Sequence, residues 1–218
     1  MRDATGRLTV LISGRGSNLR AFLQAQQSGE LDGEINAVIS NRPQAPGLEI
    51  AREAGIATEV LDHTLFETRE AFDEQLAQIV HNYSPDVVVL AGFMRILTPA
   101  FVAAFRGRLI NIHPSLLPKY RGLNTHQRAI DGGEREAGAT VHFVTADLDC
   151  GPGILQARVP VVAGDSAESL AARVLPVEHQ LYPRAANLVL TGRAVLGHDS
   201  ARLDDRVLPP GGEQWQPT

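Results

Sequence analysis

Residues 86–91 read Asp-Val-Val-Val-Leu-Ala, and this stretch decides the fold. A strand that is apolar on both faces belongs in the centre of a parallel sheet that helices cover on both sides. Before and after it, short runs of Val, Ile and Leu alternate with segments whose apolar residues recur at helical spacing. This order predicts an α/β fold with a mostly parallel central sheet and helices on both faces.

Further elements follow from the same periodicities, working outward from residues 86–91. Strands are expected at residues 8–13, 34–40, 57–61, 108–112, 138–145 and 154–162. Helices are expected at residues 18–27, 48–54, 67–82, 99–105 and 166–187, the last with Ser166 as its N-cap. The two strands after residue 135 are joined by a turn and are expected to pair antiparallel. The tail at residues 199–218 is rich in Asp, Pro and Gly and is expected to be irregular.

Length and charge limit the class of protein. The chain has 218 residues, a formal net charge of −5 and a single cysteine, Cys150. An acidic chain without runs of Lys and Arg is not expected to bind nucleic acid. Its first apolar stretch, residues 8–12, is too short for a membrane span or a signal-peptide core, so we expect no membrane association and a cytoplasmic location. One cysteine permits neither an intrachain disulfide nor a cysteine-based metal cluster.

A glycine-rich loop at residues 14–18 (Gly-Arg-Gly-Ser-Asn) joins the first expected strand to the first expected helix. Glycine lets the backbone approach a ligand, and a helix N-terminus supplies free N–H groups, so the loop can cradle a phosphate. The alternative is a tight turn without a ligand. Leu19 replaces the third glycine of a dinucleotide fingerprint, and the second strand ends at Asn41 and Arg42 instead of an acid. The loop therefore favours a monophosphate over a dinucleotide.

Asn111 and His113 lie two residues apart at the end of an expected strand, just before Pro114. Side chains alternate along a strand, so both should point to the same face, and open α/β sheets bind ligands beyond the carboxyl ends of their strands. A protonated imidazole and a side-chain amide can both donate to a developing oxyanion. The pair therefore indicates a catalytic site, and the alternative is a structural histidine that caps a loop.

Asp149 belongs to a turn at residues 147–152, where acidic residues are most often simply solvated. If this turn folds over His113, Asp149 can keep the imidazole protonated and accept protons through a water molecule. Cys150 borders the turn and is interpreted as a bystander, because no histidine next to it in sequence would generate a thiolate.

Together these motifs resemble the folate-dependent phosphoribosylglycinamide formyltransferases of the monofunctional bacterial type. The resemblance covers roughly residues 8–210, and the motifs occur in the order typical of that family. The matching stretches are Val10–Asn18, Pro85–Leu97, Leu109–Tyr120, Gly138–Asp149 and Ala163–Asp165.

The resemblance implies a Rossmann-like formyltransferase fold. It implies transfer of a formyl group from the co-substrate 10-formyltetrahydrofolate to the amine of N1-(5-phospho-D-ribosyl)glycinamide, in de novo purine (IMP) biosynthesis. By position, it implies three catalytic residues: Asn111, His113 and Asp149. It implies a ribonucleotide site made by Gly16, Ser17, Asn18, Leu175, Pro176, Val177 and Glu178. It implies a folate site made by Arg69, Met94, Arg95, Ile96, Leu97, Asn111 and Val144, and no metal.

The same family pattern implies one domain over residues 1–218, which acts on small molecules as a monomer or a homodimer. Within it we expect a phosphate-binding half at about residues 7–105 and a folate-binding and catalytic half at about residues 106–198, followed by the tail.

Three alternatives remain. A formyltetrahydrofolate hydrolase would share the catalytic trio, but such enzymes usually carry an additional N-terminal domain and do not need the phosphate loop. A methionyl-tRNA formyltransferase would need a further C-terminal domain and a basic surface. A non-catalytic nucleotide-binding or folate-binding protein would not need Asn111, His113 and Asp149 together.

Overall fold

The strand predicted around residues 86–91 is β4 (Val87–Leu90) in the computed structural model, which describes residues 6–217 of the chain. All four residues of β4 are buried. Two parallel strands flank it, β1 (Gly6–Ile12) on one edge and β5 (Leu109–His113) on the other. With a partner on each edge and helices over each face, β4 has no side exposed to water, which explains why its residues are all apolar.

The remaining elements follow largely in the predicted order. The other strands are β2 (Gly33–Ser40), β3 (Ala57–Val60), β6 (Glu136–Phe143), β7 (Gly153–Pro160), β8 (Ala194–Leu196), β9 (Ala201–Leu203), β10 (Arg206–Val207) and β11 (Glu213–Trp215). The helices are α1 (Ser17–Ser28), α2 (Gly47–Glu53), α3 (Arg69–Asn82), α4 (Pro99–Ala104), α5 (Thr125–Asp131) and α6 (Ala167–Leu190), with a short 3-10 helix, η1 (His63–Leu65). Within residues 6–217, one eight-stranded sheet has the order β11-β7-β6-β5-β4-β1-β2-β3, and β10-β9-β8 form a small second sheet.

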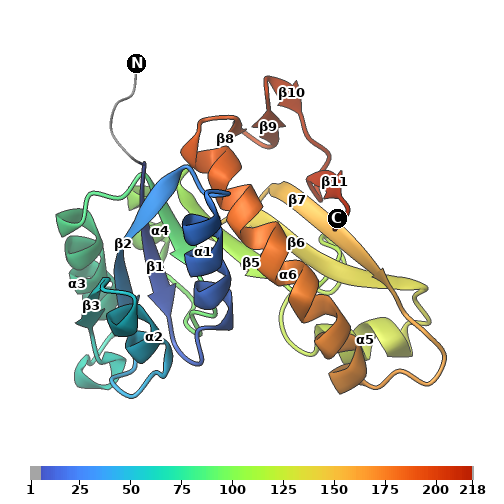
Figure 1. Ribbon diagram of the computed structural model, residues 1–218, viewed down its shortest axis with the longest axis horizontal. Helices are drawn as coiled ribbons and strands as arrows, with labels where there is room; N and C mark the ends of the chain where they lie inside the picture. Colours follow the sequence, from blue (N-terminus) through green and yellow to red (C-terminus); the bar gives the residue numbers. More distant parts are fainter. Residues whose placement is uncertain (1–5, 218) are drawn as a thin grey trace.

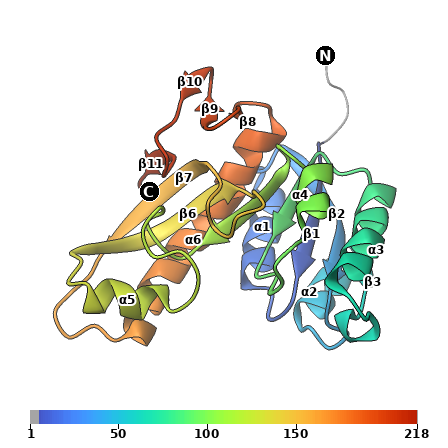
Figure 2. The same cartoon turned by 180° about the vertical axis from the view of Figure 1, so that it is seen from behind.

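Helices cover both faces of the large sheet (Figures 1 and 2). Because side chains alternate along a strand, Val87 and Val89 join a core cluster with residues of α1 and α6, whereas Val88 and Leu90 join a second cluster with residues of α3 and α4. The pairs β1–β2, β1–β4, β2–β3 and β4–β5 are parallel, and β5–β6 and β6–β7 are antiparallel. The predicted α/β fold and the antiparallel pair after residue 135 are confirmed.

Helix α6 crosses one face of the sheet, from the small second sheet toward α5 (Figure 1). Ser166 is its N-cap, as predicted, and forms a capping box with Ser169, in which each side chain accepts a hydrogen bond from the other residue's backbone N–H. One turn beyond Glu178, the buried hydroxyl of Tyr182 donates to the carbonyls of Leu90 at 3.1 Å and Ile110 at 3.0 Å. The helix is therefore fixed to the last residue of β4 and to the second residue of β5. Neither α6 nor any other helix in residues 6–217 is long and apolar enough to cross a membrane.

The structure corrects the prediction in several places, and β8 and η1 were not predicted. Helix α5 was not predicted, because only two of its seven residues are buried and its apolar pattern is correspondingly short. The prediction of an irregular tail at residues 199–218 is wrong for the described part: β9 and β10 extend the small sheet, and β11 pairs in parallel with β7, Trp215 lying opposite Ala157. These strands are only two or three residues long, so they show no readable alternation.

Candidate active site

The site begins with the alternation of side chains along β5. Ile110 and Ile112 belong to the core cluster on the α1 and α6 side, and Leu109 belongs to the cluster on the α3 and α4 side. Asn111 and His113 therefore share the face of Leu109, as predicted. They lie at the carboxyl end of the strand, where an open α/β sheet places its ligands.

His113 is buried and makes contacts through both ring nitrogens. Its Nδ1 lies 3.3 Å from Oδ2 of Asp149, and both side chains are only 8% exposed. Its Nε2 lies 2.9 Å from the backbone carbonyl of Tyr120. A carbonyl can only accept, so Nε2 carries a hydrogen and donates it to Tyr120. The turn at residues 147–152 thus folds over His113, and the two titratable residues of the expected trio lie together.

Asp149 owes its position to the backbone of its turn. Its φ of 51° lies in the left-handed region, which Asp adopts more readily than most residues. Its Oδ2 also accepts a hydrogen bond at 3.0 Å from the backbone N–H of Gly122. The carboxylate is therefore held from two sides, by His113 and by the segment that carries Tyr120.

His142 is a site residue that the sequence analysis missed. It pairs with Asn111 across β5 and β6, and its Nε2 lies 3.4 Å from Nδ2 of Asn111. Burial lowers its pKa, so the ring is neutral, and Nδ1 donates to the carbonyl of Phe143 at 2.9 Å. Nε2 is then free to accept from the Asn111 amide. Its 3.8 Å approach to Asp149 is not an ion pair, because the ring carries no charge.

A groove opens beside Asn111, with about 520 Å³ of empty space that is partly open to solvent. Five residues of the expected folate site line it: Arg95, Ile96, Leu97, Asn111 and Val144. Side chains that were not expected also line it: Leu90, Phe93, Val102, His142 and the turn residues Thr145, Ala146, Asp147 and Leu148. Mostly apolar walls with a few polar groups suit a flat heterocycle.

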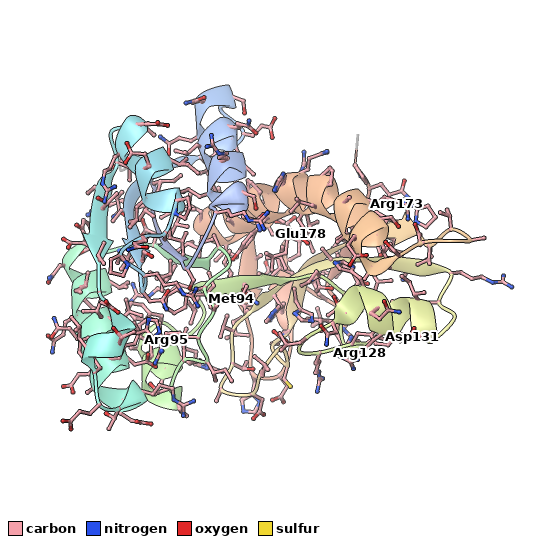
Figure 3. The ribbon with its side chains drawn as sticks, turned by 90° about the horizontal axis from the view of Figure 1, so that it is seen from below. Met94, Arg95, Arg128, Asp131, Arg173 and Glu178 are labelled. Atoms are coloured by element: carbon pink, nitrogen blue, oxygen red, sulfur yellow. The ribbon has the colours of Figure 1, made fainter. Side chains whose placement is uncertain are left out.

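Two expected folate residues lie outside this groove. Met94 is 71% exposed and lines a different hollow, the one at the glycine loop. Arg69 is the first residue of α3, and its guanidinium lies 3.8 Å from the carboxylate of Glu70. Arg95 stays at the groove, where its guanidinium stacks 4.7 Å above the ring of Phe72. Figure 3 shows Met94 near the middle of the molecule and Arg95 farther toward α3 and α4.

The glycine loop lies at the start of α1, as predicted. Gly16 has a φ of 77°, and a Cβ there would come within 2.9 Å of the Gly47 backbone, so both conformation and space require glycine. The hollow above the loop has about 690 Å³ of empty space, and its charged lining residues are Arg15 and Arg42, with no acid among the lining side chains. Free backbone N–H groups at a helix start and two cations favour an anion.

Glu178 of α6 is buried next to this loop. Burial raises its pKa to about 7, and a contact with Asn18 opposes the shift. Of the neighbouring residues expected at the ribonucleotide site, Leu175 and Pro176 are exposed, whereas Val177 is buried in the core cluster. Figure 3 places Glu178 near the middle of the molecule, while Arg173 lies farther along the same helix.

Comparisons with known proteins agree with this geometry. A family model described as formyl transferase matches residues 6–186. The phosphoribosylglycinamide formyltransferase of Escherichia coli (strain K12) is 53% identical over 205 residues, which is 94% of this chain and 97% of that protein. A trifunctional purine biosynthetic protein adenosine-3 from Bos taurus is 45% identical over 88% of this chain, which spans 19% of that longer protein.

A solved structure leads to the same family. The phosphoribosylglycinamide formyltransferase from Coxiella burnetii, in complex with CHES, superposes with a TM-score of 0.93 at 46% identity, over 98% of this chain and 100% of that chain. The resemblance inferred from the sequence motifs is thereby confirmed. The chain belongs to the formyl transferase family and, within it, to the phosphoribosylglycinamide formyltransferases.

Proposed function

We propose that this protein transfers the formyl group of 10-formyltetrahydrofolate to the amine of N1-(5-phospho-D-ribosyl)glycinamide, in the synthesis of purines. The observation that carries the proposal is the placement of Asn111 and His113 on one face at the end of β5, with the Asp149 carboxylate 3.3 Å from His113. Asn111 itself lines the groove of residues 95–97. The glycine-loop hollow is lined by residues that follow β4, and β4 is the strand next to β5.

Each substrate has a place that suits its chemistry. The folate ring system would lie in the groove between residues 95–97 and residues 144–148, as a co-substrate and not as a resident cofactor. The phosphate of the ribonucleotide would lie on Gly16, Ser17 and Asn18. Glu178 would hold the glycinamide end, because a carboxyl with a pKa near 7 can accept or donate a hydrogen bond at neutral pH.

In the chemical step, the amine nitrogen bonds to the formyl carbon and the carbonyl oxygen takes up the electron pair. The Asn111 amide would donate a hydrogen bond to this oxyanion. Both nitrogens of His113 already have partners, so the imidazolium would stabilise the oxyanion through its charge instead of through a free N–H. This differs from the sequence expectation, in which His113 donated directly.

Asp149 would stabilise the charge on His113 and pass the amine proton, through a water molecule, toward N10 of the folate. Collapse of the oxyanion then breaks the bond between the formyl carbon and N10. The products are tetrahydrofolate and the formylated amine, and nothing is oxidised or reduced.

The test is a spectrophotometric assay with a 10-formyl folate analogue, with and without the ribonucleotide. Release of deformylated folate only when the ribonucleotide is present is the expected result. Release without it would identify a hydrolase. No release in either case would mean a binding protein or a different formyl acceptor, and either result would overturn the proposal.

We extend the proposal to the chain as a whole. It acts as a single domain, with a phosphate-binding half at about residues 7–105 and a catalytic half at about residues 106–198, as a cytoplasmic monomer or homodimer. Residues 1–5 and 218 lie outside the described part of the chain. Sedimentation of the purified protein over a range of concentrations distinguishes monomer from homodimer.

A further inference from the structure

A buried chain of hydrogen bonds joins three strand ends of the large sheet. The backbone N–H of Met94 donates to Oγ of Ser13 at 2.8 Å. The Ser13 hydroxyl donates in turn to Oδ1 of Asn41 at 2.6 Å. Ser13 is 5% exposed and Asn41 is 2% exposed, so water does not compete for the bond between them, and the bond from Met94 is partly buried.

The three residues follow the carboxyl ends of adjacent strands. Ser13 comes directly after β1, Asn41 directly after β2, and Met94 lies four residues beyond the end of β4. These strands are neighbours in the order β4-β1-β2. One serine side chain therefore joins the segment after β4 to the edge from which the glycine loop starts.

Asn41 is itself held in place. The Nδ1 of His63 lies 2.8 Å from the Asn41 carbonyl, so that nitrogen carries the hydrogen and donates it. The Asn41 side-chain nitrogen lies 3.4 Å from the same ring nitrogen, which cannot accept from it while it donates to the carbonyl. His63 therefore holds the Asn41 backbone, and the side-chain oxygen of Asn41 accepts from the Ser13 hydroxyl.

The segment that Ser13 holds has left the sheet. The backbone N–H of Ala91 still donates to Leu11 of β1 at 2.9 Å, but Gly92 then turns with a φ of 71°. The other end of the segment is held by α3, because the N–H of Thr98 donates to Oδ2 of buried Asp73. Residues 92–98 thus form a bridge with one side-chain anchor at Met94 and another at Thr98.

This bridge divides the two hollows of the site. Gly92 and Met94 line the glycine-loop hollow, whereas residues 95–97 line the groove. We propose that Ser13 is a positioning residue, which holds the Met94 backbone so that the two substrates meet with the amine at the formyl carbon. The inference rests on the proposed function, in which the ribonucleotide and the folate occupy these two hollows.

A matched pair of variants tests the inference. Ser13→Ala removes the hydroxyl that holds Met94. Thr9→Val removes a similar bond between β1 and β2, because the buried Thr9 hydroxyl donates to Oδ1 of Asn36 at 2.8 Å, far from the bridge. Each variant loses one hydroxyl-to-amide bond at β1 and β2, and Ser13→Ala also loses the bond from the Met94 N–H. Thermal unfolding shows how much stability each variant loses.

We expect Ser13→Ala to lower kcat at saturating concentrations of both substrates by roughly 10- to 100-fold, because a misplacement of about 1 Å can cost that much. We expect Thr9→Val to lower kcat less than about twofold. Binding is measured separately, with inorganic phosphate for the loop and a non-reactive folate analogue for the groove. Both Kd values should stay within about threefold of the wild-type values in both variants, since the hydroxyl is expected to align the substrates and not to bind either one.

Two results would overturn the inference: kcat of Ser13→Ala equal to that of Thr9→Val, or a loss of kcat in Ser13→Ala accompanied by an equal loss of affinity for either probe. If Ser13→Ala does not fold, Ser13→Cys keeps the side-chain volume and offers only a weak acceptor, and the same two comparisons apply. Wild-type protein without ribonucleotide-dependent turnover would refute the proposed function instead, so the two failures are distinguishable.

Discussion

In the proposed reaction, Asp149 is the residue on which proton transfer depends most directly. Its carboxylate contacts His113 and the N–H of Gly122, and it is almost fully buried. A change that keeps its size but removes its charge would, in the proposed reaction, remove the partner of His113 and the proton acceptor. Such a substitution therefore tests the charge of this side chain apart from its size.

Asp149→Asn should lower kcat by roughly 100- to 1,000-fold, because both the charge on His113 and the proton transfer would suffer. Steady-state kinetics at saturating substrate concentrations measure the effect. Asp131→Asn is the matched control, since Asp131 is exposed at the end of α5 and lies away from the groove. Equal kcat values for the two variants would contradict the role given to Asp149.

Glu178 should make the stability of the protein depend on pH. Burial raises its pKa from 4.5 to about 7, so the folded chain binds this proton more tightly than the unfolded chain. The stabilisation is fully present below about pH 4.5 and is lost as the pH rises through about 7. The whole difference amounts to about 3 kcal/mol.

Urea unfolding of the wild type and of Glu178→Gln measures this effect, because the variant cannot lose the proton. The free energy of unfolding of the wild type, minus that of the variant, should fall by about 3 kcal/mol between pH 4 and pH 8. A difference that is constant over this range would show that Glu178 ionises normally.

For single residues, the sequence predicted which side chains lie at the site better than it predicted which of them contact one another. Asn111 and His113 could be placed on one face because alternation along a strand is a local property. The approach of Asp149 to His113 depends on how a turn packs across the sheet, and local patterns do not contain that information. His142 was missed because it lies within a run that reads as a buried strand, and its partner Asn111 is defined only by the pairing of β5 with β6.

Among the elements, α6 carries the most connections. Its capping box begins the helix, and the Arg173 guanidinium, which hydrogen-bonds Asp165, holds the pKa of that carboxyl well below its ordinary value. Farther along, Glu178 contacts Asn18, and Tyr182 donates to the backbone of β4 and β5. The helix therefore joins the glycine loop to the catalytic strands.

Ser166→Ala should lower the free energy of unfolding by about 1 kcal/mol, the usual cost of losing an N-cap. Turnover should not change, because the cap lies at the end of α6 that is far from Glu178. Urea unfolding provides the measurement. Ser28→Ala at the end of α1 is the control, since the Ser28 hydroxyl donates only to the Ala25 carbonyl of its own helix, at 3.2 Å, and caps no helix N-terminus. A loss of turnover in Ser166→Ala would show that the start of α6 influences the site.

The long elements were predictable from the sequence, and some of the short ones were not. The 14-residue α3 and the 24-residue α6 repeat their apolar spacing over several turns, so their patterns are clear. By contrast, α5 has seven residues, and β8, β9 and β11 have three each. The short elements that were predicted, α2, α4, β3 and β4, have apolar runs or nearby Gly and Pro that mark them, whereas α5, β8, β9 and β11 carry no such pattern.

For the molecule as a whole, the tail closes one edge of the large sheet. β11 covers β7, and the Gly153 N–H donates to the carbonyl of Pro210 at 2.9 Å. A Cβ on Gly153 would come within 2.3 Å of Gly211, so the two segments touch through their backbones. Gly153 comes four residues after Asp149. The tail therefore contacts the segment directly after the turn at residues 147–152, and it also covers the edge of the sheet.

A chain that stops at Asp199 should melt at a Tm lower by roughly 5 °C or more, which corresponds to the loss of about 2 kcal/mol in a domain of this size. It should also aggregate more readily, because the edge of β7 would be open. Thermal unfolding and light scattering measure these effects. A chain that stops at Gly212 lacks β11 but keeps the contact of Gly153 with the tail. It should aggregate as readily as the chain that stops at Asp199 and retain more activity than that chain. Unchanged melting and solubility in both would show that the tail is dispensable.

The position of Trp215 has a spectroscopic consequence. It is the only tryptophan in the chain, it lies on β11 at the edge of the sheet, and the guanidinium of Arg184 on α6 stacks 5.6 Å from its ring. Intrinsic fluorescence excited at the red edge of protein absorption therefore comes from Trp215 on β11 alone. The signal reports whether the tail is docked against β7 and α6, and it does not report changes in the phosphate-binding half of the molecule.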